Sequence, residues 1–187
     1  MTTRPGNAAR PARVLAVLLL ALAATTQAAE PFKLRTPSGS VVEFTGKSQA
    51  PATVLLFWAS WCPYCKALMP HLQSVVYQHG DDVQLYAISI ADDGDPAAYL
   101  AELGYDWPLL LEGDAVAQQY GVRGTPGLVV VDRRGATVFD LSRVQVTDAL
   151  RKRVAGAESR PGAAAQLAPF WAAELRQALE PAIRAAR

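Results

Sequence analysis

Cysteine is scarce in this chain of 187 residues: the only two, Cys62 and Cys65, lie three positions apart. Secreted domains that use disulfides as structural cross-links usually carry several pairs at wider spacing. A bond across so short a loop would add only about 2 kcal/mol of stability by the chain-entropy estimate. A stabilising cross-link is therefore a poor explanation for this pair.

The chain also lacks an apolar run of membrane-spanning length. Its N-terminal run, Val14–Ala24, is about half of the ~20 residues that a spanning helix needs. Arginines precede this run and small residues follow it, up to a plausible cleavage point near Ala28. We therefore expect residues 1–29 to be a signal peptide and the protein to be exported to the periplasm. An uncleaved N-terminal membrane tether is the alternative, and no cysteine follows the run to carry a lipid.

Charge of one sign is not concentrated anywhere. The full chain carries 18 Lys and Arg against 17 Asp and Glu, and removal of residues 1–29 would leave a net charge near −2. Arg151–Arg153 is the longest basic run and is typical of one solvated helical turn. The sequence therefore predicts no nucleic-acid binding. A content of 51% hydrophobic and 19% charged residues predicts a folded globular chain.

Strands and helices alternate along the predicted main domain, residues 30–157. The run from Val54 to Ala59 is continuously apolar, as expected for a strand covered on both faces. The pattern predicts strands at 32–35, 41–44, 83–90, 107–111, 128–131 and 136–141, and helices at 63–79, 96–103, 114–120 and 146–157. This order predicts an α/β fold with a mixed central sheet and helices on both of its faces.

A C-terminal extension, residues 158–187, follows this domain. Glu158–Ala165 is small and polar and reads as a linker. From Gln166 to Arg187, large apolar residues recur every four positions, which predicts a helix that Pro181 should kink or end. We expect its apolar stripe to dock on its own domain or on a partner.

The two cysteines lie where the strand ending near Ala59 gives way to a helix. Pro63 suits a first helical position, which places Cys62 at the N-cap. Backbone amides and the helix dipole at that end would stabilise a thiolate and lower its pKa. Cys65 falls in line with Leu68 and Leu72, so we expect Cys62 to be exposed and reactive and Cys65 to be sheltered. That asymmetry suits a two-step dithiol exchange.

The segment Phe57–Lys66 closely resembles the active-site stretch of thioredoxin-like proteins. Pro70 stands where that family has a helix-kinking proline, and Gly121–Pro126 resembles its loop before a cis-proline. The resemblance implies a thioredoxin-like fold without a cofactor, and a cis Thr125–Pro126 bond facing the cysteines. It also implies that backbone groups of Thr125 hold the substrate chain.

Trp61, Pro63 and Tyr64 flank the cysteines and, with Thr125 and Pro126, are the candidate substrate contacts. The extra strand and helix within residues 83–120 resemble the TlpA/ResA/DsbE-type branch, which are exported or membrane-tethered reductases. That branch implies protein disulfide or dithiol substrates, with a membrane electron donor of the DsbD type as a plausible partner.

Two positions depart from the family pattern. Leu56 occupies the place of thioredoxin's buried aspartate, and Gly127 stands where DsbE-type reductases tend to carry an acid. The Pro63–Tyr64 dipeptide resembles that of glutaredoxins and implies a reduction potential of about −200 to −230 mV. The sequence leaves open whether the protein reduces, oxidises or isomerises disulfides.

A metal site is the alternative class of function. Cys62, Cys65, His71 and His79 have the ligand chemistry of zinc, but the histidine spacing is too long for a zinc finger. The two thiols alone suit Cu(I), so a Cu(I) carrier or metallochaperone is the competing hypothesis. A peroxidase is disfavoured because no Thr-x-x-Cys pattern precedes the helix.

Overall fold

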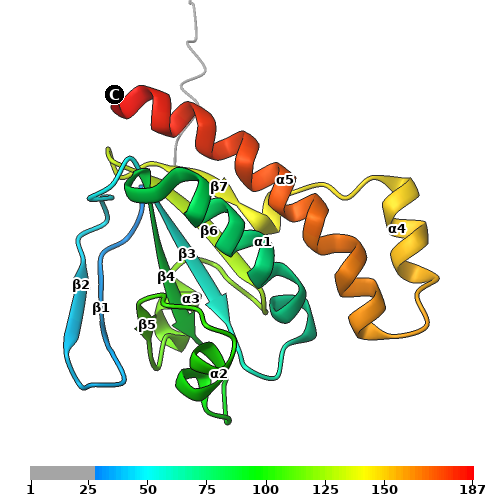
Figure 1. The fold of residues 1–187 in the computed structure, drawn as a ribbon. Coiled ribbons are helices and arrows are strands. Elements are labelled where there is room, and N and C mark those ends of the chain that lie inside the picture. The colour runs from blue at the N-terminus through cyan, green and yellow to red at the C-terminus, as the bar shows by residue number, and fades with distance from the viewer. Residues whose placement is uncertain (1–27) are drawn as a thin grey trace, which may run out of the picture.

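The computed structural model describes residues 28–187. The predicted signal peptide, residues 1–29, lies outside this part of the chain apart from its last two residues. A five-stranded mixed sheet in the order β5-β4-β3-β6-β7 forms the centre of the fold (Figure 1). Its strands are β3 (Ala52–Trp58), β4 (Val83–Ser89), β5 (Leu109–Leu110), β6 (Gly127–Asp132) and β7 (Thr137–Asp140). Strand β3 is parallel to β4 and antiparallel to β6, which confirms the predicted mixed sheet.

Helices cover both faces of this sheet, as the sequence predicted. The helices are α1 (Pro63–His79), α2 (Pro96–Glu102), α3 (Asp114–Gln119), α4 (Asp148–Ala155) and α5 (Arg160–Ala186). Short 3-10 turns span Gly80–Asp82 and Leu141–Arg143. A separate antiparallel hairpin of β1 (Phe32–Arg35) and β2 (Val41–Phe44) packs beside α3.

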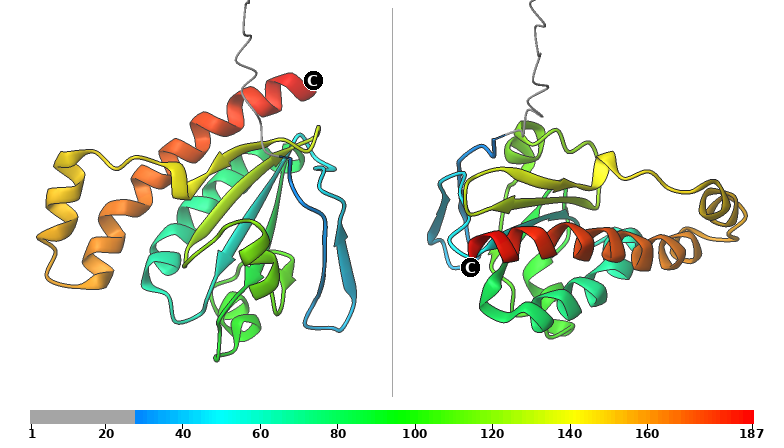
Figure 2. Two further views of the ribbon diagram at one scale, coloured as in Figure 1. Left: turned by 180° about the vertical axis from the view of Figure 1, so that it is seen from behind. Right: turned by 90° about the horizontal axis from the view of Figure 1, so that it is seen from above.

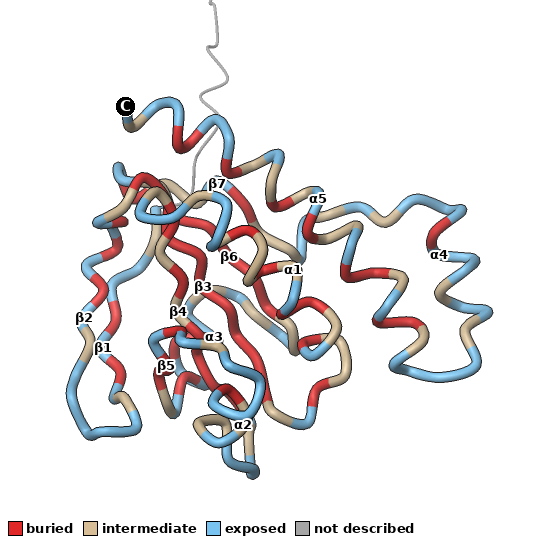
Figure 3. Tube along the Cα trace, in the orientation of Figure 1, coloured by how far each residue is buried: buried red, intermediate tan, exposed pale blue. Residues whose placement is uncertain are grey.

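Strand β3 divides the core because all seven of its residues are buried (Figure 3). Alternate side chains of a strand point to opposite faces of the sheet. Val54, Leu56 and Trp58 therefore join the cluster formed with α1, α2 and α5. Leu55 and Phe57 join the second cluster, under α3 and the β1–β2 hairpin. The continuous apolar pattern of this segment thus reflects a strand covered on both sides.

Helix α5 is longer than predicted. It begins at Arg160, where the Ser159 hydroxyl accepts a hydrogen bond from the Gly162 amide, so most of the expected linker 158–165 is helical. It also continues through Pro181, which was expected to kink or end it. Pro181 lies on the exposed side of the helix, as does Gln177, whose carbonyl loses its amide partner there. Water can satisfy that carbonyl, so the helix tolerates the proline.

Helix α5 also takes the place beside α1 on the sheet (Figures 1 and 2). Ala172, Leu175 and Leu179 are fully buried in the cluster that contains α1. Helix α4, which was expected to span 146–157 and complete the domain, is shorter and packs on α5 beyond the edge of the sheet. Only Leu150 of α4 is buried, because α4 packs mainly against one helix, α5.

Candidate redox site at the start of helix α1

The candidate site lies in the short connection between the end of β3 and the start of α1. After Trp58 a tight turn brings the Cys62 amide to the carbonyl of Ala59, at 3.0 Å. Cys62 is then the N-cap of α1, and Pro63 occupies the first turn, where a missing amide hydrogen costs nothing. The Cys65 amide donates to the Cys62 sulfur at 3.2 Å. The predicted capping geometry is therefore present.

Several hydrogen bonds lower the pKa of the Cys62 thiol to about 6. The largest contribution comes from the Cys65 thiol, which donates to the Cys62 sulfur, and burial opposes it. A hydrogen bond from Thr125 and the backbone amides of Cys65 and Tyr64 lower the pKa further. The sequence predicted only the amide and helix-dipole part of this effect, because the Cys65 side-chain donor depends on the local rotamers.

Cys65 has the opposite character. It is fully buried, and burial is the main cause that raises its pKa far above the ordinary value for a thiol. The neighbouring Cys62 sulfur, through a hydrogen bond and its charge, raises the pKa further. At neutral pH the pair therefore holds one proton, and that proton belongs to Cys65. No disulfide bond joins the two cysteines.

The expectation that Cys62 is openly exposed is wrong. Cys62 is only 2% exposed. The reason lies in the loop that precedes Pro126, which places the carbonyl of Thr125 3.5 Å from the Cys62 sulfur. The two cysteines therefore differ in acidity much more than in accessibility.

The Thr125–Pro126 peptide bond is cis, and this loop faces the start of α1. Both residues are partly exposed, and the following residue, Gly127, is buried as the first residue of β6. A Cβ on Gly127 would lie 2.5 Å from Cγ1 of Val122 and 3.2 Å from Cβ of Phe57. A larger residue here, such as the acid that DsbE-type reductases tend to carry, would therefore require Val122 or the backbone to shift.

The remaining predicted contact residues lie around Cys62 but on different sides. Trp61 is 50% exposed, and its indole nitrogen donates to the Ala91 carbonyl at 2.9 Å. Pro63 and Tyr64 are partly exposed on the first turn of α1. The Tyr64 ring lies against Trp171 of α5, with ring centroids 6.3 Å apart. Lys66, in contrast, lies over the ring of Tyr99, 4.9 Å from its centre.

Sequence reasoning missed two residues that shape this site. The residue that caps α2 is Asp95, whose carboxylate accepts the Ala98 amide at 2.9 Å. Asp92 instead accepts hydrogen bonds from the amide and hydroxyl of Ser60, two residues before Cys62. Trp171 of α5 lies against Tyr64, which is one of the two residues between the cysteines. Neither contact can be predicted from the sequence, because each joins segments that lie far apart in the chain.

An apolar groove of about 500 Å³ adjoins the site. Tyr64, Thr125 and Pro126 line it together with Leu167 and Trp171 of α5. The groove and the cysteine pair therefore share the same loop.

The structure of residues 28–187 offers no cluster of side chains that could bind zinc. No three His, Cys, Asp or Glu side chains in that range are placed to hold one metal ion. His71 and His79 are both partly exposed on α1, beyond its first turn.

Two curated bacterial proteins illustrate what the chain is similar to. It is 25% identical over 116 residues to the "thioredoxin-like protein YneN" of Bacillus subtilis, covering 58% of this chain and 66% of that protein. It is 31% identical over 104 residues to the "thiol:disulfide interchange protein HelX" of Rhodobacter capsulatus, covering 53% and 57%. The chain thus spans less than two thirds of the length of either relative.

A solved structure supports the fold. The crystal structure of a "putative thiol:disulfide interchange protein DsbE" from Chlorobium tepidum superposes with a TM-score of 0.61 at 22% identity, covering 84% of this chain and 96% of that one. At that identity the likeness establishes a thioredoxin-like fold. The model of the AhpC/TSA family matches residues 25–139, which is more than half of the chain and includes the cysteine pair and the cis-proline. The chain therefore belongs to the AhpC/TSA family.

Proposed function

We propose that this protein is an exported thiol–disulfide oxidoreductase that reduces protein disulfides by dithiol exchange at Cys62 and Cys65. The observation that carries the proposal is the division of acidity between the two sulfurs. The Cys62 pKa of about 6 makes this sulfur a thiolate at neutral pH, while Cys65 keeps its proton. The thiolate is the species that attacks a disulfide.

In the first step the Cys62 thiolate attacks one sulfur of the substrate disulfide. The substrate S–S bond breaks, a mixed disulfide forms, and the departing substrate thiolate takes up a proton. Bonding to the substrate removes the negative charge from the Cys62 sulfur, and this charge is one of the causes that raise the Cys65 pKa. Cys65 therefore releases its proton more readily once the mixed disulfide exists.

In the second step the Cys65 thiolate attacks the Cys62 sulfur. The mixed disulfide breaks, the second substrate sulfur leaves and is protonated, and a Cys62–Cys65 disulfide remains. The substrate has gained two electrons and two protons. A membrane electron donor of the DsbD type would then restore the dithiol, and the same steps run backwards would oxidise a substrate.

The proposal of export rests on the N-terminal sequence pattern of arginines, an apolar run and small residues. Cleavage at the predicted point would leave β1 and the rest of the fold intact. Within residues 28–187, no helix combines the length and the hydropathy needed to cross a bilayer. Expression of the full chain in a bacterium, followed by fractionation and measurement of its intact mass, tests export. A periplasmic product that lacks about 29 residues is expected, whereas an intact cytoplasmic product would contradict it.

Trapping tests the chemistry. The Cys65→Ala variant lacks the resolving sulfur, so it should accumulate mixed disulfides on Cys62 with an oxidised test protein, seen on non-reducing gels. Cys62→Ala is the matched control and should trap nothing. Absence of adducts with Cys65→Ala, together with tight Cu(I) binding by the unaltered chain, would reject the oxidoreductase and favour the Cu(I) carrier.

A further inference from the structure

The side chain of Trp61, the residue before Cys62, is anchored through its indole nitrogen. That nitrogen donates to the carbonyl of Ala91 at 2.9 Å, while half of the residue stays exposed. Ala91 lies two residues after β4, and its own amide donates to Oδ1 of Asp114 at 3.0 Å. Trp61, Ala91 and Asp114 also line one hollow of about 700 Å³. The backbone of Ala91 thus connects an acid at the start of α3 to the aromatic ring next to Cys62 in the chain.

Ala91 has an unusual backbone conformation. Its φ is 46°, in the left-handed region that residues with a Cβ rarely occupy because it costs free energy. Such a conformation persists only where the surroundings hold it, and it is frequent at functional sites. Both polar backbone groups of Ala91 are used, the amide by Asp114 and the carbonyl by Trp61. The contact with Asp114 therefore supports the conformation that directs the Ala91 carbonyl to the indole.

The turn that carries Asp114 is itself packed against the end of β4. The Gly113 amide donates to the Ser89 carbonyl at 2.9 Å. A Cβ on Gly113 would overlap Cγ2 of Ile88, so only glycine allows this close approach. This packing fixes the start of α3 beside the loop that follows β4, and it leaves the Asp114 carboxylate in reach of that loop.

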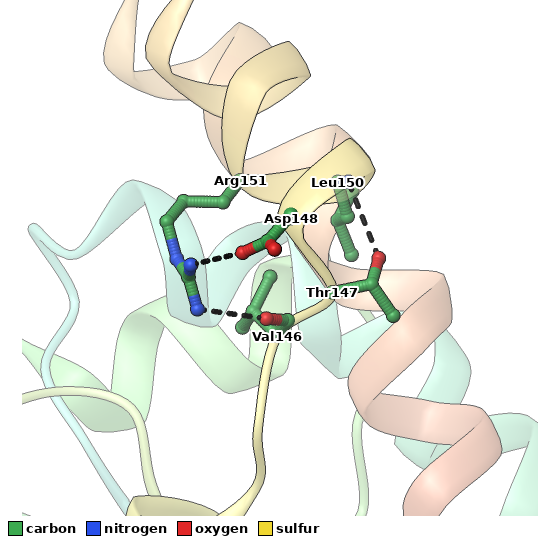
Figure 4. Close-up of polar contacts among 5 residues, drawn as sticks. All are labelled: Val146, Thr147, Asp148, Leu150 and Arg151. Atoms are coloured by element: carbon green, nitrogen blue, oxygen red, sulfur yellow. Dashed lines mark hydrogen bonds and ion pairs between the residues drawn. The ribbon is translucent and has the colours of Figure 1, made fainter.

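An acid in the first turn of a helix often serves the helix itself, as at α4. There Asp148 pairs with Arg151 one turn further on, and Thr147 caps the helix by accepting from the Leu150 amide at 3.3 Å (Figure 4). Helix α3 begins differently. Its N-cap residue makes no side-chain hydrogen bond, and its first-turn acid, Asp114, bonds to a backbone amide outside the helix. The contact of Asp114 is therefore not explained by capping of its own helix.

We propose that Asp114 is a positioning residue: through the left-handed Ala91 it holds the Trp61 ring in one orientation beside Cys62, ready to contact a partner protein. The inference rests on the proposed function, in which Trp61 is a candidate substrate contact. A ring that is fixed before binding loses little orientational freedom when a partner docks, so the contact costs less entropy. A small disulfide that does not cover Trp61 gains nothing from this arrangement.

NMR reads the position of the indole independently of activity. Trp61→Phe lacks the indole N–H and so assigns the Trp61 signal in a proton–nitrogen correlation spectrum of the reduced protein. In Asp114→Ala this signal should shift and the N–H should exchange faster with water, because its acceptor is no longer held. Asp114→Asn keeps an oxygen that accepts the Ala91 amide and should retain the signal. Asp148→Ala removes the first-turn acid of α4 and is the matched control, with the Trp61 signal unaltered.

Kinetics test how the enzyme uses this positioning. Insulin is the protein disulfide, glutathione disulfide is the small one, and a dithiol recharges the enzyme. Asp114→Ala should raise KM for insulin about two- to tenfold, the range expected when one more side chain must be ordered on binding. Its kcat for insulin and its rates with glutathione disulfide should not change. The pH midpoint of Cys62 alkylation should also stay, since it depends on contacts with Cys65, Thr125 and Tyr64.

A double-mutant cycle tests whether Asp114 acts through the indole. In the Trp61→Phe background, Asp114→Ala should have no further effect on KM for insulin, because the donor that reaches Ala91 is gone. A rise in KM that persists in this background would overturn the inference, since Asp114 would then act by another route. The same cycle with Asp148→Ala in place of Asp114→Ala should show no change at either step beyond that of Trp61→Phe.

An unmoved Trp61 indole signal in Asp114→Ala would overturn the inference whatever the activity. A shifted signal with an unaltered KM for insulin would overturn the role of the positioned ring in binding. Absence of reduction of both substrates by the unaltered chain would instead reject the proposed function and, with it, that role in binding. The NMR comparison would still decide whether Asp114 positions Trp61.

Discussion

Asp92 holds the turn that presents Cys62, because its carboxylate accepts the Ser60 amide at 2.6 Å and the Ser60 hydroxyl at 2.7 Å. It also accepts the Gly94 amide at 3.0 Å, so one side chain ties the loop after β4 to the end of β3. This tie lies on the side of Cys62 that carries Trp61, whose indole reaches the carbonyl of Ala91. The position of the reactive sulfur thus depends on two strands as well as on the helix it caps.

Replacement of Asp92 should loosen that turn. In Asp92→Asn an amide NH₂ would face backbone donors, which leaves at least one of them unpaired. We expect a loss of about 2 kcal/mol in the free energy of unfolding, measured by urea denaturation of the reduced protein. Asp93→Asn, at the exposed neighbouring position, should stay within about 0.5 kcal/mol. Equal effects of the two substitutions would contradict the assigned role of Asp92.

The pH dependence of alkylation should report the acidity of Cys62. The rate of its reaction with iodoacetamide should rise with a midpoint near pH 6, because the Cys62 pKa is about 6. Cys65→Ala removes the largest contribution to that lowering, so its midpoint should move upward. Cys65→Ser, which keeps a hydrogen-bond donor, should lie between the two. An unmoved midpoint in Cys65→Ala would show that the amides alone set the acidity.

The same lowered pKa has a consequence for stability. Cys62 titrates at about 6 in the folded protein, against 9.0 for an ordinary thiol. Protons therefore bind more strongly to the unfolded chain between these values, and the stability of the reduced protein should rise with pH from about 6 to 9. This contribution is fully present above pH 9 and is lost as the pH falls through 6. Urea midpoints of the unaltered chain minus those of Cys62→Ser should show this slope, and a flat difference would contradict it.

Gly127 should not accept a side chain. In Gly127→Ala the new Cβ would overlap Val122, at 2.5 Å from Cγ1, so the loop or the strand must shift. We expect a loss of about 1–3 kcal/mol by thermal unfolding. Val122→Ala in the same chain should recover part of that loss. Gly124→Ala, in the same loop but with nothing within 4 Å of its Cβ, is the control and should change little.

Helix α5 should contribute to the stability of the whole domain. Leu175 of α5 is fully buried in the core, so Leu175→Ala should lower the free energy of unfolding by about 2–5 kcal/mol. Gln177→Ala, two residues further on the exposed face, should cost less than about 0.5 kcal/mol. A single cooperative transition in both variants would show that α5 unfolds together with the sheet. A separate early transition would indicate an independent appendage.

Most of the fold could be predicted because its signals are local. The apolar run of β3, the Pro63 start of α1 and the Asp95 cap of α2 each depend on a few neighbouring residues. The N-cap position of Cys62 follows from the same local pattern. The predicted and observed ends of the helices and strands differ by a few residues, because helix and strand ends fray and composition does not fix them.

What could not be predicted depends on contacts between distant segments. The burial of Cys62 comes from the loop at Thr125, 63 residues away. The start of α5 was missed although Ser159 and Pro161 form a helix-start signal, because the small residues that follow resemble a linker. The tolerance of Pro181 depends on which side of the helix meets water, and that is decided by packing on α1.

The late position of α5 in the chain has a consequence for biosynthesis. Every strand of the sheet is made before residue 160, yet the part of one sheet face and of α1 that packs against α5 is covered only when α5 has been made. A nascent chain that has reached α4 still exposes the surface on which Leu175 and Leu179 pack. The core can therefore be completed only after the last 27-residue helix, Arg160–Ala186, has left the ribosome.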